Sequence, residues 1–495
     1  MDTRVNGLRI RAFVVGLSLA FAVGTVCPFL SLYLQGANAD AYFTSQIAHI
    51  VLFLLIGFVN VFLGAIKSSW AFRKGELVVI FILMSLANSV PMITFYWVPL
   101  VSTPFYFATP ENNWLNQITP YIPTWVVPHD DGAIRAFFEG ARGESSDIPW
   151  EVWLEPILGW LPLVVALHVA MVCLMVVLRR QWVEQERLIY PVMQLNLAMV
   201  QEDARGGLIR PFFRSGAMWL GFAVPVIVGA VIGLHAYFPY IPTIQLSAAI
   251  PLFGSMRLSF ATLGFFFLIQ REVAFGLWVF TLLNNLQGTI YRAVGWGIDE
   301  EAAVSVWSYG LSSLVHQGMG AMIVLVLGGL WVGREHLQRV FRKAFLGAPE
   351  VDDSDEILSY RGAVFGLLGS LAVMVLWLSQ LGMPLLGILV FLFFAFVVYV
   401  ALTRVVVEGG VAVIYAPLVA PDAAVSAIGT SVFGAPGLMG LAFTRVFANT
   451  CSTSPCRTWP IRSNSAAKSR VGDGSCSGAC CWPFCWGWPA LCGCC

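Results

Sequence analysis

Long apolar runs dominate the chain and restrict the environment in which it can fold. Each run is close to the ~20 residues that cross the hydrocarbon core of a bilayer. The runs cover residues 12–33, 46–66, 77–101, 154–178, 215–237, 259–283, 309–332, 362–381 and 384–402. Only 11% of the 495 residues are charged, whereas a soluble domain carries about 25%. The sequence therefore predicts an all-α, polytopic transmembrane helix bundle over residues 1–450, with about nine membrane segments.

The charge balance and the missing motifs exclude several classes of protein. The formal net charge is zero, and a nucleic-acid partner would require a concentrated basic face. The sequence contains no nucleotide-binding P-loop, no HExxH zinc helix and no GxSxG elbow. We expect the lipid bilayer and a small-molecule or peptide substrate as partners, with no cofactor and no metal. The oligomeric state is left open.

Lysine and arginine orient the helices, because short cytoplasmic loops are rich in these residues. The N-terminus and the loops 67–76 and 179–214 are basic, so we place them in the cytoplasm and the protein in the cytoplasmic (inner) membrane. The run 12–33 is too long for the core of a signal peptide and is interpreted as the first membrane helix. The outer loop 102–153 mixes proline with aromatic residues and forms either a cap over the outer vestibule or an interfacial belt.

The basic loop 333–361 conflicts with a count of one crossing per apolar run, because that count places it outside. Two changes restore it to the cytoplasm. The run 259–283 enters and leaves on one face as a re-entrant hairpin, or the proline-interrupted stretch 240–258 makes an additional crossing. The sequence favours neither, so the bundle is expected to contain one or more broken or re-entrant helices.

Two charges lie at the middle of the run 259–283, namely Arg271 and Glu272. Near the bilayer centre each costs about 2.5–3.5 kcal/mol. Adjacent helical side chains point about 100° apart, so we expect that the two charges do not neutralise each other and that each needs a partner, a water-filled cavity or a break in the helix. They indicate an ion or substrate pathway, or else a break in the helix or a lock between two helices.

Two segments that follow membrane helices resemble each other. Each has Glu and Arg, then Ile-Tyr, then Pro, before a weakly apolar stretch. Paired segments of this kind are typical of the binding sites of secondary transporters, where freed carbonyls and helix ends hold ions. The alternative is that the prolines merely end helices at the cytoplasmic surface. The candidate residues are Glu186, Tyr190 and Pro191 in the first segment, and Arg404, Glu408, Tyr415 and Pro417 in the second.

Two smaller signals each allow a functional and a structural interpretation. His316, at the start of the run 309–332, is either a proton relay or a polar residue at a helix end. Asp130 and Asp131 follow His129 in the outer loop and either chelate a divalent metal or form a solvated turn.

The last 45 residues differ from the rest of the chain, because 451–495 hold nine of the eleven cysteines. The spacing fits neither a zinc site nor a disulfide framework. Cys and Trp codons begin with TG, so a preceding C creates the leucine codon CTG in a neighbouring frame. We therefore expect a frameshift between Ala448 and Ser454, and a native chain that continues with further helices.

Several stretches together resemble a known family. They are PYIPTWVVP (120–128), ERLIYPVMQL (186–195), GLHAYFPYIP (233–242), SYRGAVFGLLG (359–369) and RVVVEGGVAVIYAPLVAP (404–421). The family is one of uncharacterised bacterial polytopic membrane proteins catalogued as paired domains of unknown function. It is distantly similar to the oligopeptide transporter superfamily, which implies proton-coupled import of peptides or metal chelates.

The resulting hypothesis is a secondary transporter of peptides or other small organic solutes, coupled to protons or another ion. Its proton or ion candidates are Glu186, Glu272 and Glu408, and Arg271 and Arg404 are candidates for the substrate anion or a counter-charge. Tyr190, Pro191, His316, Tyr415 and Pro417 are candidates for the lining of the site. The alternatives are a membrane-embedded glycosyltransferase that uses Asp130 and Asp131, and a non-catalytic membrane scaffold.

Overall fold

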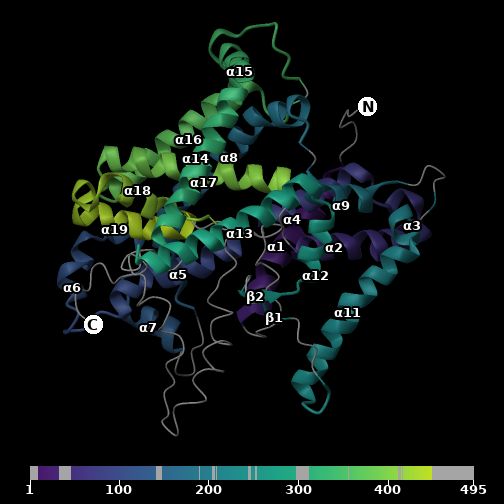
Figure 1. Ribbon diagram of the computed structural model, residues 1–495, viewed down its shortest axis with the longest axis horizontal. Helices are drawn as coiled ribbons and strands as arrows, with labels where there is room; N and C mark the ends of the chain where they lie inside the picture. The colour runs from purple at the N-terminus through teal and green to yellow at the C-terminus, as the bar shows by residue number, and fades with distance from the viewer. Residues whose placement is uncertain are drawn as a thin grey trace.

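The computed structural model describes most of the chain as packed helices (Figure 1). The residues it describes are 9–32, 46–87, 89–140, 148–188, 190–202, 207, 209–242, 247–250, 254–296, 311–354, 356–410, 414 and 416–448. Within these ranges the helices form a bundle with one short β-hairpin, which confirms the predicted all-α class. Seven of the described helices are long and apolar enough to cross a membrane. The predicted tail, 451–495, lies outside the described residues.

The first half of the chain contributes the helices α1 to α11. Their bounds are α1 (Ile10–Leu32), α2 (Gln46–Leu54), α3 (Asn60–Ile66), α4 (Lys74–Ala87), α5 (Ser89–Tyr106), α6 (Trp114–Gln117), α7 (Asp131–Glu139), α8 (Trp150–Arg180), α9 (Pro191–Val200), α10 (Pro211–Arg214) and α11 (Gly216–Tyr237). Single π-helical turns join α2 to α3 and extend α8 over Gln181–Gln185. Short 3₁₀ turns cover Ser68–Trp70, Thr119–Tyr121 and Thr124–Val126.

The second half begins with the hairpin and continues with eight helices. Their bounds are β1 (Ser247–Ile250), β2 (Gly254–Arg257), α12 (Phe260–Phe267), α13 (Arg271–Val294), α14 (Ser312–Val332), α15 (Arg334–Leu346), α16 (Tyr360–Gln380), α17 (Leu385–Gly409), α18 (Ala420–Ile428) and α19 (Thr430–Ala448). The strands are antiparallel, with Ser247 opposite Arg257. The sequence analysis did not predict helices α18 and α19, because the stretch after Pro417 is only weakly apolar.

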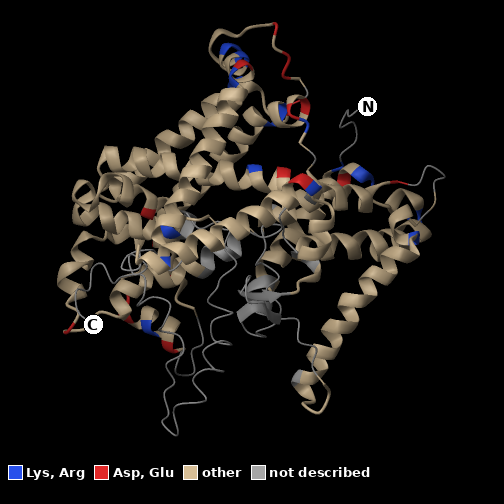
Figure 2. Cartoon of the chain, viewed as in Figure 1, with Lys and Arg blue, Asp and Glu red and all other residues tan. Residues whose placement is uncertain are grey.

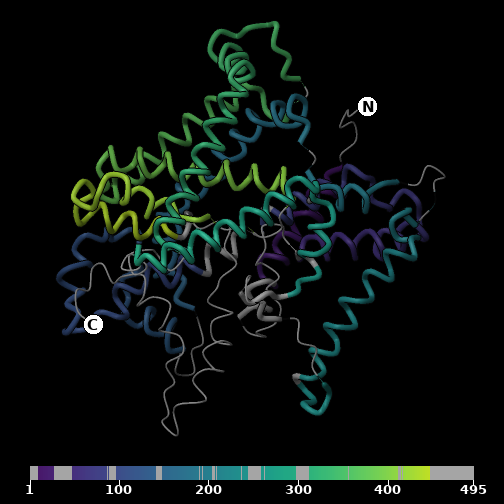
Figure 3. Tube along the Cα trace, viewed as in Figure 1, coloured from purple at the N-terminus to yellow at the C-terminus, as the bar shows by residue number. Residues whose placement is uncertain are grey.

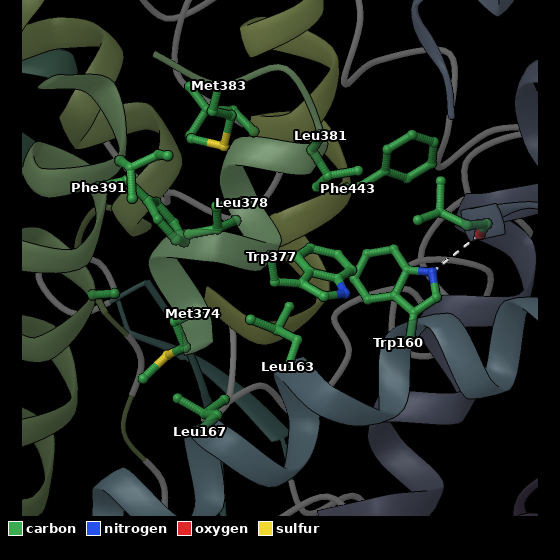
Figure 4. Packing of buried hydrophobic residues seen from close by; sticks show 14 of the residues in the cluster. Trp160, Leu163, Leu167, Met374, Trp377, Leu378, Leu381, Met383, Phe391 and Phe443 are labelled. Atoms are coloured by element: carbon green, nitrogen blue, oxygen red, sulfur yellow. Dashed lines mark hydrogen bonds between the residues drawn. The ribbon is translucent and has the colours of Figure 1, made fainter. Parts of the chain in front are cut away.

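The packed centre of the bundle lies between α8 and α16 (Figure 4). Trp160 of α8 and Trp377 of α16 lie with ring centroids 4.8 Å apart. Both indole N–H groups are satisfied: Trp160 donates to the carbonyl of Val126 at 3.0 Å, and Trp377 donates to that of Gly159 at 2.8 Å. Buried indoles need such partners. Val126 belongs to the outer loop, so this loop is packed onto the two long helices.

A second apolar core gathers α1, α2, α4, α9 and α10 around Leu52, Ile80 and Met84, and two smaller clusters also occur among the described residues. By contrast, α11 has none of its apolar span buried, and Figure 3 shows it extending away from the other helices. Helix α13 is only slightly better covered. The protein therefore has a densely packed side and a side whose apolar helices are open to lipid.

Two basic parts of the chain meet on one face of the bundle, namely the end of α8 and the segment 333–361. Arg179, at the end of α8, forms an ion pair with Glu356 at 2.7 Å. His336 of α15 lies 2.9 Å from the carbonyl of Val177. Figure 2 shows charged residues gathered around α15 and at helix ends, whereas the long helices between them are largely uncharged. The described residues of 333–361 therefore lie beside the end of α8.

The run 259–283 is broken into two helices, which was one of the alternatives for this run, but the second helix extends beyond the predicted end at residue 283. The chain turns at 268–270, between α12 and α13, and α13 continues to Val294. The eight residues of α12 extend only about 12 Å. The alternative of a crossing helix over 240–258 is wrong, because the described part of that stretch contains the strands β1 and β2.

Candidate functional site

The first broken segment starts where α8 loses its regular form. A π-helical turn over Gln181–Gln185 ends at Glu186, and Arg187 and Tyr190 then adopt positive φ angles of 53° and 51°. Residues other than glycine rarely adopt this conformation, which costs about 1–3 kcal/mol each and is frequent at functional sites. Pro191 is the first residue of α9, a position that needs no N–H donor.

The second broken segment starts at the end of α17. Gly410 ends this helix with a φ of 62°, a conformation that glycine adopts without strain. A Cβ atom at Gly410 would lie 2.7 Å from Cβ of Pro191 and 3.5 Å from Cγ1 of Ile269. The close approach therefore requires glycine, and it brings together the end of α17, the start of α9 and the turn before α13.

A cluster of three charged side chains joins the two segments. Nη2 of Arg404 lies 2.5 Å from Oε2 of Glu186, and Nε of Arg404 lies 3.1 Å from Oε2 of Glu408. The side chains of Arg404 and Glu186 are only 17% and 15% exposed, and that of Glu408 is 45% exposed. Two carboxylates share one guanidinium group, so the cluster carries a formal excess of one negative charge.

Two residues of the π-helical turn complete the surroundings of the cluster. Nε2 of Gln181 donates to Oε1 of Glu186 at 3.0 Å, and the guanidinium of Arg404 lies 5.5 Å from the ring centroid of Trp182. The sequence analysis missed both residues. Gln181 and Trp182 precede Glu186 by five and four positions. This helical spacing places them on the same side of the helix as Glu186, and it could have identified them from the sequence.

A small pocket opens beside Arg404. Its lining residues are Leu178, Gln181, Trp182, Leu325, Val326, Gly329, Leu330, Gly333, Leu337, Val400 and Arg404. Its volume is about 20 Å³, and a single water needs about 10–15 Å³ on this scale. Oε1 of Gln181 is buried and has no hydrogen-bond partner among the described residues. In this conformation the pocket admits a water or a small ion, and a peptide would require the helices to separate.

The remaining members of the two broken segments have different positions. Tyr190 is half-buried beside the cluster, and burial raises the pKa of its phenol. Pro417 packs instead against α14, where a Cβ atom at Gly318 would lie 2.7 Å from it. Tyr415 lies outside the described residues. His316, also on α14, is 3.1 Å from Oγ of Ser426 and so belongs with Pro417 rather than with Arg404.

The structure corrects the expectation about Arg271 and Glu272. Nε of Arg271 lies 2.9 Å from Oε1 of Glu272, and the side chains are 93% and 69% exposed. The two residues open α13 instead of lying within a continuous helix, so their long side chains reach each other at the helix end. The expectation that the two charges do not neutralise each other was wrong, whereas the alternative of a break in the helix agrees with the turn before Arg271.

Asp130, in the loop 102–153, has a structural role in the described conformation. Oδ1 of Asp130 accepts a hydrogen bond from the N–H of Ala133 at 2.9 Å and caps α7. Nε2 of His129 lies 2.7 Å from the carbonyl of Thr124. Within the described parts of the chain, no three His, Cys, Asp or Glu side chains converge as a metal site would require.

The helices and their apolar surfaces define a polytopic α-helical membrane protein. The chain belongs to a family of unknown function, DUF6785, whose model matches residues 2–459. No curated protein matches the chain, and neither does any solved structure.

Proposed function

We propose that the protein is a secondary transporter of peptides or other small organic solutes, coupled to protons or another ion. One observation carries the proposal: Arg404 of one broken segment is paired with Glu186 of the other, at the point where three helix ends meet. Sites of this type in transporters lie between broken helices. The distant similarity to oligopeptide transporters suggested by the sequence motifs points to the same class of substrate.

The cluster suggests how a proton would be coupled to a substrate. Protonation of Glu186 removes one of the two negative charges that hold Arg404 in place, because an ion pair needs both charges. The guanidinium group then keeps only its more exposed partner Glu408, and the donors that Glu186 releases bind the carboxylate of a substrate, for which the planar guanidinium is well suited. The pocket is too small for this substrate in the present conformation, so opening of the helices belongs to the same step.

We further propose that the protein lies in the cytoplasmic membrane with its N-terminus in the cytoplasm. The support is the meeting of the end of α8 with the basic segment 333–361, since cytoplasmic loops are rich in arginine and lysine. The Glu186–Arg404–Glu408 cluster lies close to the same face, because Gly333 after α14 packs against Gln181.

The proposal is tested by uptake into liposomes that contain the purified protein. Labelled di-, tri- and tetra-alanine are supplied with and without a pH gradient. Glu186→Gln is expected to lower gradient-driven uptake at least about tenfold, which corresponds to about 1.4 kcal/mol. The matched control is Glu184→Gln, two residues away, whose side chain is 48% exposed and paired with Arg180; it is expected to retain uptake.

Two outcomes would overturn the assignment. Equal uptake by Glu186→Gln and the unmutated protein removes Glu186 from the mechanism. Absence of uptake of all three peptides by the folded protein favours the scaffold, or the glycosyltransferase if sugar transfer depends on a divalent metal and on Asp131. No contact in the described residues favours the glycosyltransferase, because Asp130 is used as a helix cap.

We also propose that the chain after about residue 448 is the product of a shifted reading frame. Most of the cysteine-rich tail lies beyond the end of the family match at residue 459. Re-reading the DNA for residues 443–465 is the test: a single inserted or deleted base that opens a leucine-rich frame supports the proposal, and an intact frame refutes it.

A further inference from the structure

A second polar site lies on α18, away from Arg404. Asp422 in the first turn of α18 forms an ion pair with Arg445 of α19 through its Oδ1 atom. The two side chains are only 16% and 27% exposed. The other carboxylate oxygen of Asp422, Oδ2, is buried and has no hydrogen-bond partner among the described residues. One oxygen of this carboxylate is therefore available to a further ligand.

The next turn of α18 connects this site to α14. Ser426 follows Asp422 by four residues and so lies on the same side of the helix, and its Oγ is 3.1 Å from Nε2 of His316. Nδ1 of His316 lies 2.8 Å from the carbonyl of Ser312. Both Ser426 and His316 are exposed, so this side of the site lies at the surface of the described helices.

An apolar cluster separates the second site from the Glu186–Arg404–Glu408 cluster. Its buried members are Val315, Met319 and Val326 of α14, Val397, Val398, Ala401 and Leu402 of α17, and Leu418 and Ala423 at α18. Thirteen residues of α14 separate His316 from Gly329, which lines the pocket of Arg404, and they extend about 20 Å. The two polar sites therefore lie at opposite ends of the same packed helices, with apolar side chains between them.

We propose that Asp422 is a proton-binding carboxylate of this protein, on the far side of the apolar cluster from Glu186. A proton from the surroundings adds to the carboxylate at Oδ2 to give the neutral acid, and its loss restores the ion pair with Arg445. The charged partner of Asp422 is Arg445 from α19; His316 from α14 lies against Ser426, one turn further along α18, and α17 contributes apolar residues to the contact. Its role in coupling rests on the proposed transport function, but proton binding itself does not.

The first measurement is a pH titration of the reconstituted protein by infrared spectroscopy, which records the C=O stretch of a protonated carboxyl group. The difference between the unmutated protein and Asp422→Asn isolates the band of Asp422. Identical spectra for the unmutated protein and Asp422→Asn overturn the proposal, whatever the transport result.

The second measurement separates coupling from substrate binding. Asp422→Asn is expected to lose peptide uptake driven by a pH gradient and to retain exchange of labelled for unlabelled peptide, which needs no net proton movement. Asp353→Asn is the matched control, because Asp353 is also a partly buried aspartate, 19% exposed, near a cation, with Lys343 at 3.9 Å; it is expected to behave as the unmutated protein. Gradient-driven uptake that survives in Asp422→Asn overturns the coupling role.

One further variant and one combined outcome keep the proposal open to refutation. If Asp422→Asn does not fold, the double variant Asp422→Asn/Arg445→Gln removes both charges, and it must lack the infrared band of Asp422. An infrared band without any peptide transport by the unmutated protein means that the transport proposal fails and the proton site stands.

Discussion

Two groups of charged residues beside broken helices differ in almost every respect. Arg271 and Glu272 are neighbours in the sequence and pair with each other at the exposed start of α13. Arg404 pairs with Glu186, which comes from a distant part of the chain, and both side chains are largely buried. The first pair can form in any conformation that starts a helix at Arg271. The second pair forms only when α8 and α17 pack together, so its presence depends on the tertiary structure.

The difference teaches that the position of a charge within an apolar run does not measure its burial. Arg271 and Glu272 lie at the centre of the run 259–283, but the chain turns just before them. Glu186 and Arg404 lie at or beyond the ends of runs and are covered by the π-helical turn of α8 and by α17. A buried charge depends on its partner far more than an exposed one does.

The largest effect on stability is expected for Arg404→Ala. It leaves Glu186 largely buried without its cation, which lowers the free energy of unfolding by about 3–5 kcal/mol. Arg404→Lys retains the charge but not the planar donors, so its effect is expected to be intermediate. Denaturant unfolding in detergent measures the effect of both variants. If Arg404→Ala lowers the free energy of unfolding by less than about 1 kcal/mol, the cluster contributes no more to stability than an exposed ion pair does.

A second buried ion pair, between Glu76 and Arg11, is expected to make the stability of the protein depend on pH. Oε2 of Glu76 lies 2.6 Å from Nη2 of Arg11, and the side chain of Glu76 is 1% exposed. Burial alone would raise the pKa of Glu76, but the hydrogen bonds from Arg11 and from the N–H of Arg73 outweigh it, and the pKa is lowered.

Because the pKa of Glu76 is lower in the folded protein than in the unfolded chain, its stabilisation is complete above the ordinary glutamate pKa. It is lost as the pH falls through the folded value. Glu76→Gln is expected to cost about 2 kcal/mol at neutral pH and to weaken the acid dependence of unfolding. An unchanged acid dependence, measured by melting at a series of pH values, would show that another carboxylate is responsible.

A smaller effect is expected for Asp130→Ala, which removes a contact between residues close in sequence. The loss of the cap of α7 costs about 1 kcal/mol, and Asp130→Asn costs less because asparagine is as good a cap. Thermal melting measures both. Added Mg²⁺ or Mn²⁺ is expected to leave the melting temperature unchanged, and a metal-dependent rise that Asp131→Asn abolishes would instead support the glycosyltransferase.

The smallest effect on stability is expected for Glu272→Gln and Arg271→Gln. The pair is exposed, and exposed pairs contribute little, so the melting temperature is expected to be unchanged. Uptake gives the sharper result. Glu272→Gln protein that is fully folded but inactive would show that the exposed pair acts in transport, whereas normal uptake would restrict the site to Glu186, Arg404 and Glu408.

Local features of the sequence determined the class of the protein and much of its secondary structure. A bilayer imposes its length and polarity on each segment independently, so most apolar runs coincide with long helices. Pro191 and Gly410 similarly mark a helix start and a helix end, because their backbone preferences act within one or two residues. The two broken segments were found for the same reason.

The tertiary structure alone decided which of these features meet. Arg404 had several carboxylates as possible partners, and only the packing of Gly410 against Pro191 brings it to Glu186. The Asp422–Arg445 pair and the turn before Arg271 were likewise absent from the sequence reading. The physical reason is that a charge pair depends on distance and on the removal of water, and both are set by helices from distant parts of the chain.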